Sequence, residues 1–187
     1  MKKKVISLIL TKFIILIFSS PVFSQENIIT DERDGKQYKT VRIGHQVWMA
    51  ENIDFESENS WWYNDKKRYR KKYGRLYTWS AAMNACPSGW HLPSDEEWTK
   101  LIGFYGGEKF AAKELSIVGR SGFDVRFSGL RDSTGVFYDI GHDANFWSSI
   151  SVEKNNAWRC FFTRGYNDVV QDYYSKEGGL SVRCIQD

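Results

Sequence analysis

The clearest structural signal in the chain is the stretch Cys86-Pro87-Ser88-Gly89-Trp90-His91-Leu92-Pro93-Ser94-Asp95-Glu96-Glu97-Trp98. Ser94 and Glu97 have the spacing of a capping box, in which each side chain accepts a hydrogen bond from the other residue's backbone N–H. Apolar side chains then continue at helical spacing: Trp98, Leu101, Ile102 and Tyr105. Gly106-Gly107 is a typical helix end. The stretch therefore predicts a helix that begins after Ser94.

On the N-terminal side of this helix, the residues predict a hairpin and a shorter helix. The apolar positions of residues 38–48 favour two short strands, with Gly44-His45 as the turn between them. Glycine in the first turn position suits a type II′ turn, because glycine enters positive φ at little cost. Residues 80–85 suit a short helix with Thr78 as its N-cap, and residues 110–115 suit a third, weaker helix.

After Gly119, short apolar or alternating segments are separated by Gly, Asn, Asp and Ser. These segments predict antiparallel strands at residues 123–127, 136–140, 145–149, 157–162, 169–173 and 180–185. The order is a hairpin, two or three short helices and then loop-rich antiparallel β-structure. This order favours an α+β fold over an alternating α/β fold.

Residues 54–73 form a long polar segment without a clear period. Long loops in compact domains are often functional. The segment contains Trp61, Trp62 and Tyr63, which we predict to contact a ligand, because aromatic rings on a loop can pack on sugar rings. The basic run at residues 66–72 could bind an anion, although a solvated loop is the favoured interpretation. It is a poor signal for nucleic acid, because no base-reading module surrounds it.

Residues 1–24 have the order of a secretory signal peptide: a basic head, a short apolar run and small residues at the exit. We expect cleavage before Gln25, a polar lead-in at residues 25–35 and one domain at residues 36–187. No cysteine lies near the cut, so we expect an exported protein without a lipid anchor, secreted, periplasmic or on the outer surface. No membrane span is expected after processing. The processed chain carries 22 Lys and Arg against 23 Asp and Glu, a net charge of −1, which is not the composition of a nucleic-acid-binding protein.

The chain has three cysteines, Cys86, Cys160 and Cys184. In an oxidising compartment two of them should form a disulfide and leave the third free. The residues alone leave all three pairings open.

Motifs of the common catalytic and metal sites are absent from the sequence. We find no P-loop, no dinucleotide-binding glycine motif, no metalloprotease helix motif and no nucleophile elbow. His45, His91 and His142 have no metal-ligand spacing, so we predict no catalytic residues. Oxygen-bearing residues on the predicted loops could hold a structural calcium ion, but turn formation is the favoured interpretation. These residues are Asp124, Asp132, Asp139, Asp143, Asn145 and Asp168.

Six motifs, taken in order, give the chain a family resemblance. They lie at residues 38–52, 73–79, 86–98, 127–131, 146–149 and 179–184, and include Tyr73-Gly74-Arg75-Leu76-Tyr77-Thr78-Trp79. Together they resemble the Fibrobacter succinogenes major paralogous domain family, over residues 35–187. The resemblance implies an exported bacterial protein with a C-type-lectin-like fold. The family is also similar, more distantly, to formylglycine-generating and sulfatase-modifying domains. The resemblance implies no established activity.

The resemblance also implies a disulfide pairing, because Cys86 and Cys184 lie in recurring motifs and Cys160 does not. The implied bridge would close the longer loop, which gains more stability than a Cys160–Cys184 bridge. Cys160 is then expected to be a buried free thiol.

The leading functional hypothesis is a non-enzymatic binding module for a cell-surface or extracellular ligand, with glycans as the first class to test. The alternatives are an enzyme related to formylglycine generation and a structural or adhesion domain of the cell envelope.

Overall fold

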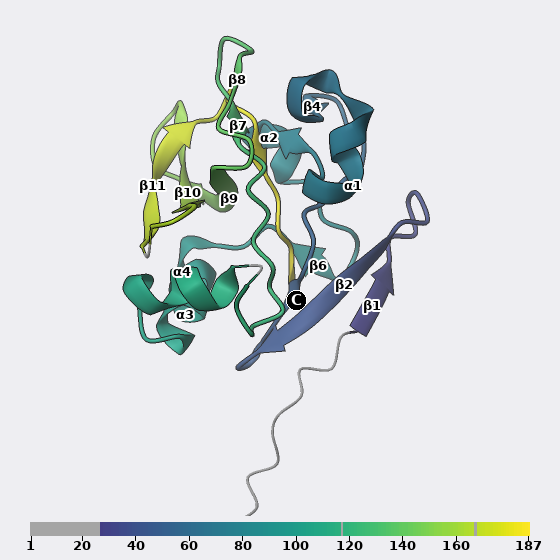
Figure 1. Ribbon diagram of the computed structural model, residues 1–187. Helices are drawn as coiled ribbons and strands as arrows, with labels where there is room; N and C mark the ends of the chain where they lie inside the picture. The colour runs from purple at the N-terminus through teal and green to yellow at the C-terminus, as the bar shows by residue number, and fades with distance from the viewer. Residues whose placement is uncertain (1–26, 117, 167) are drawn as a thin grey trace, which may run out of the picture.

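The structure is a computed structural model that describes residues 27–116, 118–166 and 168–187 (Figure 1). The predicted signal peptide at residues 1–24 and the predicted cleavage site before Gln25 lie outside the described residues.

The described residues contain short helices and thirteen strands. The α-helices are α1 (Arg70–Tyr73), α2 (Trp79–Ala82), α3 (Asp95–Phe104) and α4 (Glu108–Leu115), and the 3₁₀ helices are η1 (Tyr63–Asp65) and η2 (Lys67–Tyr69). The strands are β1 (Asn27–Thr30), β2 (Gln37–Ile43), β3 (Gln46–Met49), β4 (Ser60–Trp61), β5 (Leu76–Tyr77), β6 (Trp90–His91), β7 (Leu130–Arg131), β8 (Phe137–Tyr138), β9 (Asp143–Ser151), β10 (Asn156–Thr163), β11 (Val169–Ser175), β12 (Leu180–Ser181) and β13 (Ile185–Gln186).

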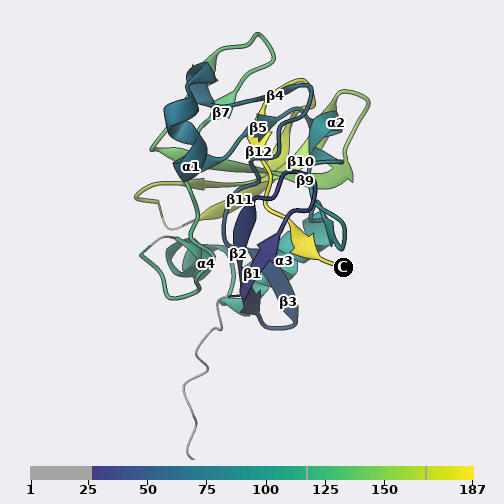
Figure 2. The same cartoon turned by 90° about the vertical axis from the view of Figure 1, so that its right-hand side faces the viewer.

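Two mostly antiparallel sheets organise the molecule (Figures 1 and 2). One has the strand order β1-β2-β3-β13-β6, and the other has the order β11-β10-β9-β12-β5-β4. Strands β7 and β8 form a separate two-stranded hairpin. Helices α3 and α4 lie together below β9–β11 in Figure 1. The prediction of an α+β fold is confirmed, whereas the C-type-lectin-like assignment stays a prediction.

The capping box at the start of α3 is confirmed. The Glu97 backbone N–H donates to Ser94 Oγ at 3.3 Å, and the Ser94 backbone N–H donates to Glu97 Oε2 at 2.7 Å. The apolar face of α3 then buries Trp98 against Trp48 of β3, with ring centroids 4.9 Å apart. The first helical turn thus fixes the helix that anchors one of the two hydrophobic clusters.

The predicted N-terminal hairpin is also confirmed, as β2 and β3. Gly44 in its turn has a φ of 59°, as expected for glycine in this position. The structure adds strand β1, which pairs with β2 so that Asn27 lies opposite Thr40. Residues 27–30 show no alternation of apolar and polar side chains, so a strand in this part of the polar lead-in was not predicted.

Two predicted strands differ in the structure. Residues 180–185 form not one strand but two, β12 and β13, which belong to different sheets. Between them the backbone pairs with the segment after β3, where the Ile53 N–H donates to Val182 O at 3.0 Å. Residues 123–127 form no ladder and make one isolated bridge, between Val125 and Ser116. Asp124 has a φ of 53° there, which interrupts an extended conformation.

Candidate functional site: a cationic pocket beside β2

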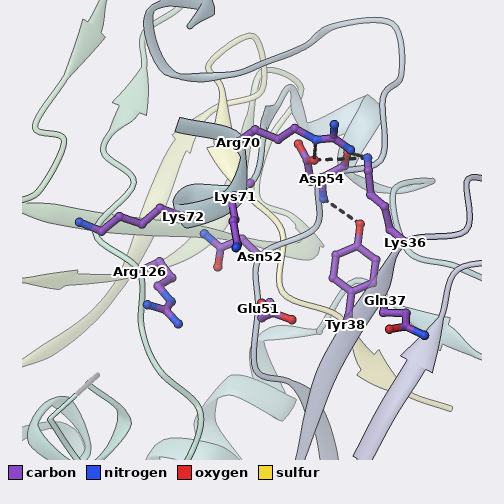
Figure 3. A pocket seen from close by; sticks show the side chains of 11 residues that line it. Lys36, Gln37, Tyr38, Glu51, Asn52, Asp54, Arg70, Lys71, Lys72 and Arg126 are labelled. Atoms are coloured by element: carbon purple, nitrogen blue, oxygen red, sulfur yellow. Dashed lines mark hydrogen bonds and ion pairs between the residues drawn. The ribbon is translucent and has the colours of Figure 1, made fainter. Parts of the chain in front are cut away.

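A pocket of about 430 Å³ lies between the start of β2, the segment after β3 and helix α1 (Figure 3). The side chains around it come from four separate parts of the chain. They are Lys36, Gln37, Tyr38, Glu51, Asn52, Asp54, Arg70, Lys71, Lys72 and Arg126, and Gly74 completes the lining. Five are cationic and two are acidic, a net charge of +3. The pocket is therefore strongly positive in a protein that is close to neutral.

At one end of the pocket, Asp54 neutralises the surrounding cations. Its carboxylate accepts a hydrogen bond from Arg70 Nε at 2.5 Å and lies 3.3 Å from Lys36 Nζ and 3.8 Å from Arg75 Nε. It also accepts a hydrogen bond from Trp62 Nε1 at 2.8 Å. The positive charges at this end of the pocket are therefore compensated by a carboxylate of the protein itself.

Tyr38 closes the same end from below. The Asp54 backbone N–H donates to the Tyr38 hydroxyl at 3.1 Å, as Figure 3 shows. Burial raises the pKa of Tyr38, so its hydroxyl stays protonated at any physiological pH. Tyr38 thus contributes a neutral polar wall.

At the other end, the cations lack close carboxylate partners. Within the described parts of the chain, no carboxylate pairs with Lys71 or Lys72, and Arg126 makes only a long contact of 3.8 Å with Asp124. Figure 3 shows the Lys71 side chain pointing into the pocket between Asn52 and Tyr38. Lys72 and Arg126 lie beside one another at this end. This end carries the uncompensated charge.

The floor of the pocket is a fixed polar network around Asn52, which is 5% exposed. Its Nδ2 donates to Tyr73 O at 3.0 Å and to Ser181 Oγ at 3.2 Å. Its Oδ1 accepts from Arg183 Nη2 at 2.8 Å and Nε at 3.1 Å. With donors and acceptor fully used, Asn52 is held rigidly.

Arg183 lies behind this floor, fully buried, and its guanidinium donates to the carbonyl groups of Met49, Phe123 and Asp124. No carboxylate pairs with it in the part of the chain that the structure describes. Burial lowers the pKa of Arg183 to about 9, and the charge of Arg126 acts in the same direction. Arg183 therefore remains charged at neutral pH and adds a second positive charge near Arg126.

Gly74 explains why helix α1 lies against the pocket. Its φ is 68°, and a Cβ at this position would come within 2.6 Å of Ile53 O. Only glycine permits this approach of α1 to the segment after β3. The approach presents the three cations Arg70, Lys71 and Lys72 to the pocket.

The three aromatic residues predicted to bind a ligand are not part of the pocket lining. Trp61 is half-buried under Arg131, whose Cζ lies 4.0 Å from the ring centroid, and Trp62 is half-buried under Arg75 at 4.1 Å. Tyr63 is 7% exposed. The structure brings Trp62 to the pocket through Asp54, but it places all three rings among protein neighbours. Their contact with a ligand stays a prediction.

The segment around these rings is more ordered than the sequence indicated. Residues 54–73 were predicted to be an irregular loop, but they contain β4, η1, η2 and α1. Each element is only two to four residues long. Periodicity cannot be detected over so few residues, which is why the pattern was missed.

The cysteines follow the implied pairing. Cys86 and Cys184 form a disulfide with Cα atoms 5.9 Å apart. Cys160 is a free, buried thiol, and burial raises its pKa well above the usual value.

The histidines and acidic residues show no metal-binding arrangement. Across residues 27–116, 118–166 and 168–187, no three His, Cys, Asp or Glu side chains are grouped as a metal site would require. His91 instead bridges Glu97 and Asp187, at 2.9 and 2.7 Å. His142 contacts Asp143 at 2.8 Å.

Most pocket residues were not predicted as a site from the sequence. The one signal was the basic run, whose last three residues line the pocket. Lys36, Tyr38, Glu51 and Arg126 lie far from that run in sequence, and only the folded chain brings them to it.

Comparison with known proteins supports the resemblance seen in the motifs. The family model described as the Fibrobacter succinogenes major domain matches residues 41–186. The chain belongs to this family. The match includes every pocket residue except Lys36, Gln37 and Tyr38. No curated protein and no solved structure matches the chain.

Among the described residues of this family member, no helix is long and apolar enough to cross a membrane.

Proposed function

We propose that the protein is an exported, non-enzymatic binding module for a cell-surface or extracellular ligand that carries an acidic group, with acidic glycans as the class to test first. The supporting observation is the open end of the pocket. Lys71 and Lys72 there have no carboxylate partner among the described residues, and Arg126 has only a distant one.

The physical argument rests on the mutual repulsion of these cations. Like charges held close together cost free energy, which an incoming anion removes. Arg126 can form two parallel hydrogen bonds to a carboxylate or sulfate, and lysines supply mobile point charges. The pocket volume of about 430 Å³ lies within the usual range for small-ligand sites.

The polar lining suits hydroxyl groups beside the acidic group. Gln37 and Glu51 line the pocket with an amide and a carboxylate. These are the groups that orient sugar hydroxyls by hydrogen bonding. A sugar acid would thus find a cation for its charge and acceptors for its hydroxyls.

The alternative of a formylglycine-generating type of enzyme requires a close pair of reactive cysteines. Cys184 is bonded to Cys86, and Cys160 is buried with a raised thiol pKa. The cysteine chemistry therefore favours the binding module. The other alternative is a structural or adhesion domain of the envelope. Binding of a small acidic ligand would favour the binding module over it.

The test is calorimetric titration of the processed chain with galacturonate, glucuronate and sulfated galactose, against glucose as the neutral control, with and without calcium. The acidic sugars should bind and glucose should not. Raising the salt concentration from 50 to 300 mM should weaken binding several-fold, because the attraction is electrostatic.

Variants locate the site. Lys71→Ala and Arg126→Ala should each weaken binding about tenfold, which corresponds to the ~1.4 kcal/mol expected for a charge-assisted hydrogen bond. Lys109→Ala, an exposed lysine on α4, is the matched control. Equal binding of neutral sugars, or equal effects of the control, would contradict the proposal.

A further inference from the structure

A row of ring-supported cations continues from the pocket across the adjoining surface. Lys72, which lines the pocket, places its Nζ 4.9 Å from the centroid of the Tyr73 ring. Arg68 places its Cζ 4.8 Å from the Tyr69 ring. We call Lys72, Arg68 and Arg131 the cation row, because each lies over an aromatic ring.

Arg131 is the far end of the row. It comes from strand β7, and its Cζ lies 4.0 Å from the Trp61 ring and 5.8 Å from the Phe137 ring. Figure 1 shows the β7–β8 hairpin standing beside the β4–α1 segment. Two segments distant in sequence therefore supply one row.

The rings under the row are continuous. Phe137 packs on Tyr63 at 5.3 Å, Tyr63 on Tyr69 at 5.7 Å, and Tyr69 on Tyr73 at 6.0 Å between centroids. Tyr63 and Tyr73 are buried and form the base, whereas Tyr69 and Phe137 are half-buried. This base holds the cations in place, which reduces the entropy they lose when a ligand binds.

The positive charges of the cation row are not compensated by carboxylates of the described residues. Within the described ranges, no carboxylate forms an ion pair with Lys72, Arg68 or Arg131. Together with Lys71 and the weakly paired Arg126 of the pocket, this surface presents a series of positive charges with little compensation. A single acidic group cannot satisfy them all.

We propose that the ligand is an acidic oligosaccharide, with one acidic unit in the pocket and the following units along the cation row. This inference rests on the proposed function of the pocket. Acidic glycans carry a carboxylate or sulfate at intervals along the chain, and a row of spaced cations matches that pattern. Hydroxyl groups between the acidic ones can accept hydrogen bonds from the forked donors of Arg68 and Arg131.

Single-stranded nucleic acid is the less suitable polyanion. Its bases require exposed ring faces on which to stack. Here the cations themselves lie over the rings of Tyr69, Tyr73 and Trp61.

The experiment is titration of the processed chain with galacturonate and its oligomers of two, four and six units, and with a chondroitin sulfate tetrasaccharide as the sulfated arm. The tetramer should bind at least tenfold more tightly than the monomer, because further acidic units reach Arg68 and Arg131. Length-dependent binding in either arm supports the inference, and the stronger arm identifies the acidic group.

Variants separate the row from the pocket. Arg68→Ala and Arg131→Ala should weaken tetramer binding three- to tenfold and leave monomer binding unchanged. Lys71→Ala should weaken both, and Lys109→Ala neither.

If the monomer binds but the tetramer binds no more tightly, the cation row is not a subsite and the pocket proposal stands. If no acidic sugar binds, the pocket proposal fails and the row fails with it. An oligonucleotide of equal charge that binds as tightly as the tetramer would overturn the choice of glycan.

Discussion

Two regions of the molecule organise cationic side chains in opposite ways. The C-terminal crossing, residues 182–184, buries Arg183 completely and surrounds it with carbonyl and amide oxygens, next to the Cys86–Cys184 disulfide. The α1 segment keeps its cations near solvent and relies on one carboxylate, Asp54, to hold part of them. The first region therefore stabilises the fold, whereas the second leaves positive charge exposed, as the binding function proposed above requires.

Within the C-terminal crossing, the disulfide should make the largest single contribution to the free energy of unfolding. Its two cysteines are 98 positions apart, and closing a loop of that size is worth roughly 4–5 kcal/mol in the chain-entropy model. Cys86→Ala combined with Cys184→Ala should lower the free energy of unfolding in urea by about that amount. Cys160→Ala is the control for loss of a buried thiol and should cost about 1 kcal/mol. A double variant no less stable than the control would show that the bridge is unimportant.

Removing the buried charge should have the next largest effect. Arg183→Met leaves the Asn52 side chain and three backbone carbonyls without their donors. Each unsatisfied buried group costs about 1–3 kcal/mol, and relief of the buried charge offsets part of the total. We expect a net loss of about 3 kcal/mol, measured by urea denaturation. Greater stability of the variant would mean that burying the charge outweighs the hydrogen bonds.

Asp54→Asn tests the second region. The change removes the negative charge that Lys36, Arg70 and Arg75 share, so we expect a loss of about 1–2 kcal/mol. The effect should be concentrated in α1, and trypsin should cleave residues 66–72 several times faster than in the unchanged protein. Glu96→Gln, which affects only the exposed pair with Lys100, is the control. Uniformly faster cleavage elsewhere would contradict a local role.

The smallest expected effect is a pH dependence at His91, which lies in β6 at the edge of its sheet. Burial alone would lower the pKa of His91, but its hydrogen bonds to Asp187 and Glu97 raise it above the usual value. A raised pKa stabilises the fold at pH values below about 6.5, and the contribution is lost as pH rises through the folded-state pKa.

His91→Ala should therefore cost more at pH 5.5 than at pH 8.5. The pKa of Glu97 is below its usual value. Burial raises this pKa, but the hydrogen bonds from Ser94 and His91 together lower it by more. Glu97 therefore remains ionised at pH 5.5. His91 is 41% exposed, so solvent screening limits the difference to a few tenths of a kcal/mol, at most about 1. An effect that grows with pH would refute the assignment.

The parts of the fold that were predicted correctly depend on nearby residues. Ser94 and Glu97 lie three positions apart, and the Gly44 turn lies between strands that pair directly. The split of residues 180–185 into two sheets was not predictable, because Arg183 looks like a surface residue until its buried oxygen partners are known. The pocket was missed for the same reason: Tyr38, Glu51 and Arg126 are distant in sequence and meet only in three dimensions.

The position of β13 has a consequence for the order in which the chain folds. Residues 185 and 186 lie inside their sheet, between β3 and β6, rather than at its edge. The N-terminal hairpin and β6 therefore cannot be joined in this sheet until residues 185 and 186 have been synthesised and are free to pair. Pairings between such distant segments are slow to form. The β3–β13–β6 part of the sheet should therefore form late, after the β2–β3 hairpin has formed from neighbouring residues.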